Sequence, residues 1–132
     1  TLTYNAGTYT LYANGSSTPD GTDSNYVTQI GATVFNSFRL GQVANAYYFN
    51  GNIDEVAIWS TALSASEIPD IQELGAPIDL TSDNGTYTSS ANLTNYWRGG
   101  DSDSGTGTTM SDIQGSLNGT LSGDAQFTAD AP

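Results

Sequence analysis

The sequence contains no cysteine, no histidine and no lysine, and its only cationic side chains are two arginines. Without cysteine there are no disulfides and no thiolate chemistry, so cysteine usage says nothing about the redox compartment. Without histidine and lysine, the usual catalytic triads, zinc sites and Schiff-base lysines are excluded. A pair of carboxylates is therefore the only catalytic equipment that this chain can offer, as in glycoside hydrolysis.

Positive charge is nearly absent, since fourteen aspartates and glutamates outweigh the two arginines and give a net charge of −12. Binding to a nucleic acid needs clustered lysine and arginine side chains, and the sequence has no such cluster. Anionic membrane surfaces are expected to repel the chain for the same reason. No apolar run approaches the ~20 residues needed to span a bilayer, so membrane insertion is not expected either.

The residues that are present favour a single all-β domain over residues 1–132. Aromatic residues make up 11% of the chain and charged residues only 12%, with Thr, Ser, Asn and Gly filling most of the remainder. This mixture suits pleated surfaces and tight turns and disfavours helices. Alternation predicts a strand over residues 8–13, ended by an Asn-Gly turn, and further strands near residues 26–30 and 37–40.

Residues 47–59 predict a β-hairpin, because residues 49–53 (FNGNI) place turn chemistry between two apolar runs. The second strand, residues 53–59, has apolar residues on both faces and is expected to be covered on both sides. Its acidic pair, Asp54 and Glu55, would then point in opposite directions and could share one ligand only across a bulge.

A short helix is predicted near residues 66–74, with Ser66 as its N-cap and a Gly-Ala-Pro stop after it. Pro69 then falls in the first turn, where its missing N–H has no intrahelical partner to lose. A start at Ala65 with a Ser64–Glu67 capping box is the alternative, but it places Pro69 deeper in the helix.

Two segments resemble laminin-G-like modules of the concanavalin A-like superfamily. Residues 47–75 resemble the closing segment of such a module, in which F-x-G-x-I-D-E-V-x-I leads into A-L-S-x-x-E-I. Residues 96–127 are similar to a segment that usually opens the module, and the matching positions are Trp97, Gly107, Thr108, Asp112, Gly115, Gly119 and Leu121. The resemblance implies a two-sheet antiparallel jelly-roll sandwich with its halves in swapped order. Residues 1–75 form the closing half, 76–90 a linker or irregular crossing, and 91–132 the opening half; a permuted domain and a truncated one are both open.

Candidate site residues follow from side-chain type and from this resemblance. Asp101, Asp103 and Asp112 offer oxygen ligands for calcium, the one cofactor considered, although none is required. Tyr47, Tyr87 and Tyr96 are the candidates for stacking on a glycan, and Tyr47 and Tyr48 face opposite ways, so at most one of them is expected to be free. Leu2 and Tyr4, in an N-terminal strand, are the candidates for partner contacts.

The resulting expectation is a non-enzymatic structural module on the surface of a virion, as a capsid decoration or fibre component, or in an extracellular setting. Hydrolases of the superfamily carry E-x-D-x-x-E on one strand, and no such spacing occurs here. The lysine-poor, Thr-, Asn- and Gly-rich style is similar to that of laminin-G-like segments in virion proteins of marine bacteriophages and in secreted bacterial proteins. Its expected partners are other virion or surface proteins, including further copies of the chain. The alternative is a carbohydrate-binding adhesion module that uses calcium.

Overall fold

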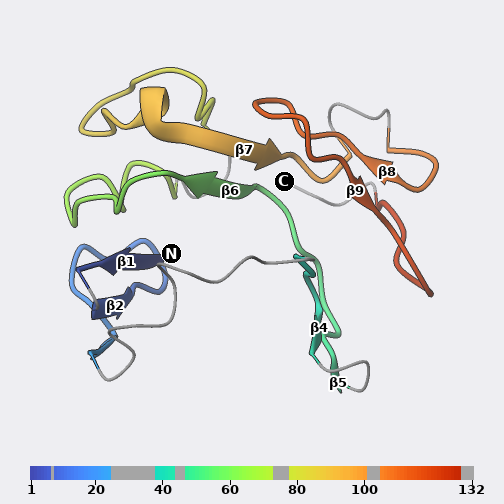
Figure 1. Cartoon of the computed structure of the whole chain (residues 1–132), viewed down its shortest axis with the longest axis horizontal. Helices are drawn as coiled ribbons and strands as arrows, with labels where there is room; N and C mark the ends of the chain where they lie inside the picture. Colours follow the sequence, from blue (N-terminus) through green and yellow to red (C-terminus); the bar gives the residue numbers. More distant parts are fainter. Residues whose placement is uncertain (7, 25–37, 44–46, 73–77, 101–104, 129–132) are drawn as a thin grey trace.

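A computed structural model describes residues 1–6, 8–24, 38–43, 47–72, 78–100 and 105–128 (Figure 1). Its strands are short, and every strand pair is antiparallel. No α-helix occurs in the described part of the chain, so the all-β expectation is confirmed and the pairing is consistent with a jelly roll. None of the described helical segments is long and apolar enough to cross a bilayer.

The N-terminal sheet contains β1 (Leu2–Asn5), β2 (Thr8–Leu11) and β3 (Gly21–Asp23), in that order. Threonine, tyrosine and leucine alternate along β1 and β2, and the rings of Tyr4 and Tyr9 lie opposite each other with centroids 4.9 Å apart. After β2 the chain turns at Asn14 and Gly15, which have φ angles of 53° and 65°. The predicted Asn-Gly turn is therefore confirmed, because both residue types tolerate the left-handed region.

A two-stranded ribbon follows, formed by β4 (Gln42–Val43) and β5 (Tyr47–Tyr48). The predicted hairpin across residues 49–53 is wrong, because β5 pairs with the strand before it and the following strand pairs elsewhere. No strand is present at residues 38–40, where one was expected, and residues 25–37 lie outside the described part.

The central pair joins β6 (Val56–Trp59) to β7 (Leu93–Trp97), which are distant in the sequence. A short 3-10 helix, η1 (Ser90–Asn92), leads directly into β7. β6 begins later than predicted, because Glu55 has a φ of 51° and cannot belong to the strand. Ile58 in β6 is 37% exposed, so the expectation that both faces of this strand are covered is also wrong.

The C-terminal ribbon contains β8 (Thr109–Met110) and β9 (Gly119–Thr120). It is tied to the central pair by a bridge between Trp97 and Asp112. The indole Nε1–H of Trp97 also donates to the carbonyl oxygen of Leu117 over 2.9 Å. In Figure 1 this ribbon follows on from the end of β7.

The predicted helix at residues 66–74 is replaced, in its described part, by consecutive turns. The N–H of Ile71 donates to the carbonyl of Glu67 over 3.2 Å, and that of Gln72 donates to the carbonyl of Pro69 over 3.3 Å. Pro69 has no N–H to donate, so it removes one of the few bonds that a helix this short could form.

The hydrophobic core lies between the central pair and the irregular segments on either side of it. Its buried side chains are Tyr12, Leu63, Ile68, Ile78, Leu80, Tyr87, Leu93 and Tyr96. Trp59, Ala57 and Ile71 pack against them. Residues 78–90, expected as a linker or irregular crossing, carry no strand in the structure but contribute three of these buried residues.

Candidate functional site

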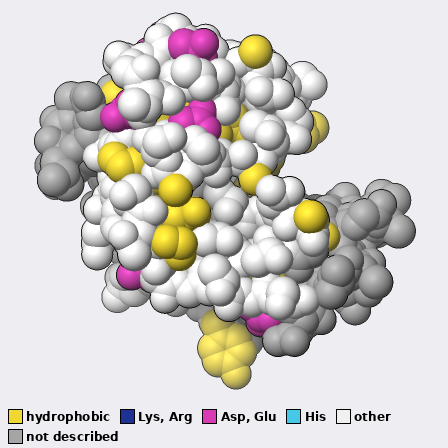
Figure 2. Space-filling view, turned by 90° about the vertical axis from the view of Figure 1, so that its left-hand side faces the viewer, with side chains coloured by type: hydrophobic (Ala, Val, Ile, Leu, Met, Phe, Trp, Pro, Cys, Tyr) yellow, Lys and Arg dark blue, Asp and Glu magenta, His cyan; other side chains and the backbone are white. Residues whose placement is uncertain are grey.

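An open cleft of about 970 Å³ separates β1 from β6. Its walls come from the start of the chain, the turn after β2, β6 with the residues that follow it, and the core: residues 1–4, 12–14, 55–63, 71, 72, 78 and 80, with Phe38 at one end. Most of these side chains are apolar or small. Figure 2 shows hydrophobic side chains gathered near the middle of one face of the molecule, with carboxylates scattered above and below them.

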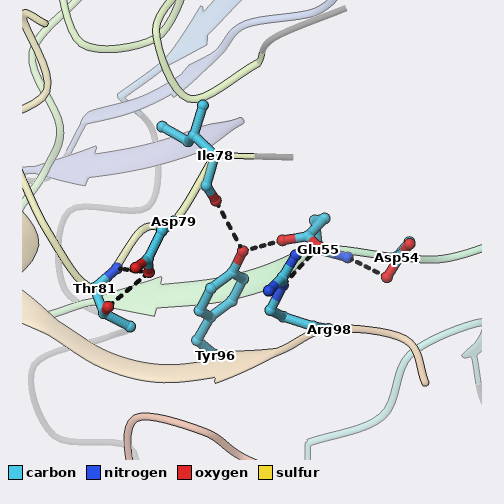
Figure 3. Close-up of polar contacts among 7 residues, drawn as sticks. All are labelled: Asp54, Glu55, Ile78, Asp79, Thr81, Tyr96 and Arg98. Carbon is cyan, nitrogen blue, oxygen red and sulfur yellow. Dashed lines mark hydrogen bonds and ion pairs between the residues drawn. The ribbon is translucent and has the colours of Figure 1, made fainter. Parts of the chain in front are cut away.

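A charged side chain stands at the cleft, where Glu55 forms an ion pair with Arg98 over 3.1 Å (Figure 3). The hydroxyl of the fully buried Tyr96 donates to the Glu55 carboxylate and lies 3.3 Å from the carbonyl oxygen of Ile78. Burial raises the pKa of Tyr96, and the hydrogen bond to Glu55 raises it further, so this phenol stays protonated. Figure 3 shows Asp54 pointing away from this group, and its Oδ1 accepts the N–H of Glu55 over 2.8 Å.

Asp112 organises the C-terminal segment around β7. Its buried carboxylate accepts five N–H groups, from the Asn95 amide at 2.6 Å and from the backbones of Tyr96, Gly115, Leu117 and Gln114 at 2.9 to 3.2 Å. Burial raises the pKa of Asp112, but the bonds from Asn95 and the backbone lower it by more, so the pKa lies well below its ordinary value. A side chain at Gly115 would meet the carboxylate at 2.6 Å, which explains the glycine.

The carboxylate of Glu67 likewise accepts hydrogen bonds from separate segments of the chain. Its Oε2 accepts the backbone N–H and the hydroxyl of Ser64, both over 2.8 Å, and its Oε1 accepts the N–H of Thr88 over 3.1 Å. The Ser64–Glu67 contact is the half of a capping box that the alternative helix start implied. Burial raises the pKa of Glu67, but the bonds from Ser89, Ser64 and Thr88 lower it by more, so the net direction is downward.

The comparisons with known proteins give one match. The family model described as the Concanavalin A-like lectin/glucanases superfamily, of laminin G type, matches residues 1–69. This span is slightly more than half of the chain. The chain belongs to this family. Neither the curated proteins nor the solved structures that were searched include a match.

The match assigns this laminin-G-like chain a β-sandwich fold, and it covers most of the first segment that carried the resemblance and none of the second. The match ends at residue 69, yet most of the buried core comes from residues beyond it. The second segment, with Trp97 and Asp112, is joined to the first through the pairing of β6 with β7.

The glycan candidates do not lie together in this laminin-G-like domain. Tyr87 and Tyr96 are both fully buried, and the Tyr87 hydroxyl donates to the Leu80 carbonyl and accepts the indole N–H of Trp59. Neither ring therefore presents a face to a ligand. Tyr47 is 74% exposed and Tyr48 73%, so the side chains of both are largely accessible to solvent. A two-stranded ribbon leaves both of its faces open, and that is the physical reason.

The calcium candidates are described only in part. Asp101 and Asp103 lie outside the described residues, so that prediction remains a prediction for them. The carboxylate of Asp112 is occupied by five N–H donors, which leaves it no role as a ligand without losing those bonds. Across the part of the chain that is described, no group of three or more acidic side chains could hold a metal ion.

The partner-contact candidates, Leu2 and Tyr4, both line the cleft, and Leu2 is 64% exposed. Sequence reasoning missed Glu55 as the partner of Arg98, whereas the Ser64–Glu67 contact was part of the alternative helix start. The Ser-x-x-Glu spacing at residues 64–67 was a usable signal for Glu67. The Glu55–Arg98 pair had no local signal, because the two residues meet only through the pairing of β6 with β7.

Proposed function

We propose that this laminin-G-like domain is a non-enzymatic structural module that makes protein–protein contacts through the β1–β6 cleft, on a virion as a capsid decoration or fibre component or on another extracellular surface. The observation that carries the proposal is an apolar cleft of about 970 Å³ that opens beside strongly exposed hydrophobic side chains. Large exposed apolar areas on a soluble domain are typical of interaction sites. The acidic, lysine-free composition supports a solvent-facing position on the virion.

A structural role is also supported by what the described carboxylates do. Glu55 is held by Arg98 and Tyr96, Glu67 by Ser64 and Thr88, and Asp112 by backbone amides. Hydrogen bonds lower the pKa of Glu67 and of Asp112, which makes each of them a poor general acid at neutral pH. Glu55 is engaged by its ion pair with Arg98, so all three carboxylates are better suited to stabilising the fold than to glycoside hydrolysis.

The test uses the absence of cysteine, because a single introduced cysteine is then the only thiol in the chain. Leu2→Cys places it on the cleft and Leu117→Cys places it elsewhere, at nearly equal exposures of 64% and 65%. Maleimide labelling rates are compared between the native particle or surface layer and the purified chain. We expect Leu2→Cys to be protected in the native assembly by about tenfold or more and Leu117→Cys to react equally in both. Equal reactivity of Leu2→Cys in both states would refute the proposed function.

The alternative, carbohydrate binding, is favoured by the exposed rings of Tyr47, Tyr48 and Phe49. A glycan array, run with calcium and with a chelator, separates it from the structural role. A glycan that binds the wild type and not Tyr47→Ser would establish the alternative. A blank array, together with protection of Leu2→Cys, favours the structural module.

A further inference from the structure

The hairpin formed by β1 and β2 holds two phenol rings in contact. Tyr4 of β1 is the register partner of Tyr9 of β2, and their ring centroids lie 4.9 Å apart with an angle of 46° between the ring planes. The ring contacts of Trp97 with Phe38 and of Trp59 with Tyr87 each involve a tryptophan, so they do not bring two phenols together.

The hydrogen bonds of the hairpin explain why these two rings come close. The amino group of Thr1 donates to the Tyr12 carbonyl, and the N–H of Tyr12 donates to the Thr1 carbonyl, both over 2.8 Å. Bonded and non-bonded pairs alternate along an antiparallel ladder, so the register makes Tyr4 and Tyr9 a non-hydrogen-bonded pair. Side chains lie closest to each other at pairs of this kind.

The two rings lie on the more exposed face of the hairpin. Side chains alternate between the faces of a strand, so Tyr4 shares its face with Leu2, and Tyr9 shares the same face with Leu11. Leu2 is 64% exposed and Leu11 49%, whereas Tyr12, on the opposite face, belongs to the buried core. Both phenol rings of the pair are half-buried. A small solute can therefore reach them without unfolding the sheet.

The hairpin is held by few buried side chains. In β1 and β2 together, Thr3 is the only buried residue. Register is weakly specified where little of a strand is buried, and a slip by one residue turns every side chain to the other face. The chain contains no cysteine, so a disulfide cannot fix this register. A covalent link between the two rings would fix it.

We propose that Tyr4 and Tyr9 are a modification site at which a one-electron oxidant, a haem peroxidase with hydrogen peroxide, joins the two rings as dityrosine. Each phenol gives up one electron and its hydroxyl proton, and the two radicals form a carbon–carbon bond between ring positions next to the hydroxyls. The hydrogen on each of these carbons then moves to the oxygen as a proton, which restores both aromatic rings and both hydroxyls. The two electrons and two protons that are released reduce one hydrogen peroxide to two waters. Coupling is fast here because the folded hairpin already holds the rings together.

Other tyrosines of the described chain are poorer sites for such a link. Tyr87 and Tyr96 are fully buried, and the hydroxyl of each donates a hydrogen bond within the fold. Tyr47 and Tyr48 are neighbours in one strand, so their side chains point to opposite faces of the β4–β5 ribbon. The modification therefore does not depend on the β1–β6 cleft or on the proposed function.

The experiment treats the purified full chain with a haem peroxidase and hydrogen peroxide, at protein concentrations low enough to make coupling between molecules slow. The readouts are the fluorescence of dityrosine in the monomer fraction and the intact mass, which falls by two hydrogen atoms. Cleavage after Arg39 releases residues 1–39, and fragmentation of this peptide by mass spectrometry locates the link. A link between Tyr4 and Tyr9 removes the backbone fragments that end between them.

Three variants make the assignment specific. Tyr4→Phe and Tyr9→Phe each remove one phenol and keep the ring, and the matched control, Tyr47→Phe, removes a phenol that is 74% exposed. Thermal unfolding verifies that each variant folds. We expect the wild type and the control to give equal yields of linked monomer, independent of protein concentration. Each hairpin variant is expected to give at least about tenfold less.

Three results would overturn the proposal. One is a monomer fraction without dityrosine, including the case in which dityrosine occurs only in dimers. Another is a link that maps to residues other than Tyr4 and Tyr9. The third is a yield of linked monomer from Tyr4→Phe or Tyr9→Phe that equals the yield from the wild type.

Discussion

The two halves of the molecule bury apolar and aromatic side chains to different extents. We call residues 1–53 the open half and residues 54–128 the packed half. Among the described residues, eight of the eleven large exposed hydrophobics lie in the open half, whereas Tyr12 is the only one of its hydrophobics in the buried core. The packed half buries tyrosine completely at Tyr87 and Tyr96. The difference teaches that the packed half supplies most of the buried apolar contacts, whereas the described residues of the open half leave much of their apolar surface exposed.

The sharpest test of this contrast compares one tyrosine from each half. Tyr96→Ala removes a fully buried ring and leaves a cavity beside β6, so we expect a loss of about 3–5 kcal/mol in the free energy of unfolding. Tyr47→Ala, at a 74% exposed site, is expected to change it by less than about 0.5 kcal/mol. Urea denaturation at pH 7 measures both, and equal losses would remove the distinction between the halves.

The second test removes the carboxylate that joins the C-terminal segment to β7. Asp112→Ala leaves the buried N–H of Tyr96 and the partly buried N–H groups of Gly115 and Leu117 without an acceptor, so we expect a cost of about 3 kcal/mol. Asp124→Ala, at an exposed position, is the control and should be nearly neutral. A neutral Asp112→Ala would mean that this segment does not contribute to the stability of the packed half.

A smaller effect is expected when only a hydroxyl is removed. Tyr87→Phe keeps the buried ring but deprives the Trp59 indole of its acceptor and the Leu80 carbonyl of its donor, at a cost of about 1–2 kcal/mol. Tyr48→Phe, in the open half, is expected to have no measurable effect. The prediction fails if denaturant midpoints of the two variants coincide.

The smallest expected effect depends on pH. Hydrogen bonds hold the pKa of Glu67 below its ordinary value of 4.5, so its carboxylate stabilises the fold above that value and loses this contribution as the pH falls through the folded-state pKa. Glu67→Gln is expected to cost about 1 kcal/mol at pH 7 and progressively less below pH 4.5. Urea unfolding of both proteins between pH 7 and pH 3 measures the difference, and a constant gap would contradict the assignment.

Parts of the fold could be predicted where the signal was local. The left-handed Asn14–Gly15 turn follows from two residue types that favour this conformation. Trp97 and Asp112, which the second resemblance singled out, form a bridge in the structure, and the Asp112 carboxylate accepts backbone N–H groups. The Ser64–Glu67 contact could also be predicted from the sequence. The expectation that a helix would form with Pro69 in its first turn was wrong.

What could not be predicted depends on contacts between distant residues. The Asn50-Gly51 dipeptide signals a bend, and the Phe49 ring does lie against Gly51, but no local rule pairs β6 with β7. The Glu55–Arg98 pair arises from that pairing, and the cleft arises where β6 lies across from β1, which is also distant in the sequence. The burial of Tyr87 and Tyr96 depends on the β6–β7 pairing as well, since core packing decides which of several similar rings is covered.

The backbone of Glu55 links the two halves in a further respect. Its left-handed conformation is costly for a residue with a side chain, by about 1–2 kcal/mol, and it occurs at the point where the open half meets the packed half. Arg98 and Tyr96, both from the packed half, hold the Glu55 side chain in place. The path of the chain between β5 and β6 is thus tied at Glu55 to side chains of the core, so a core substitution that releases Glu55 is expected to change how residues 49–54 approach β6.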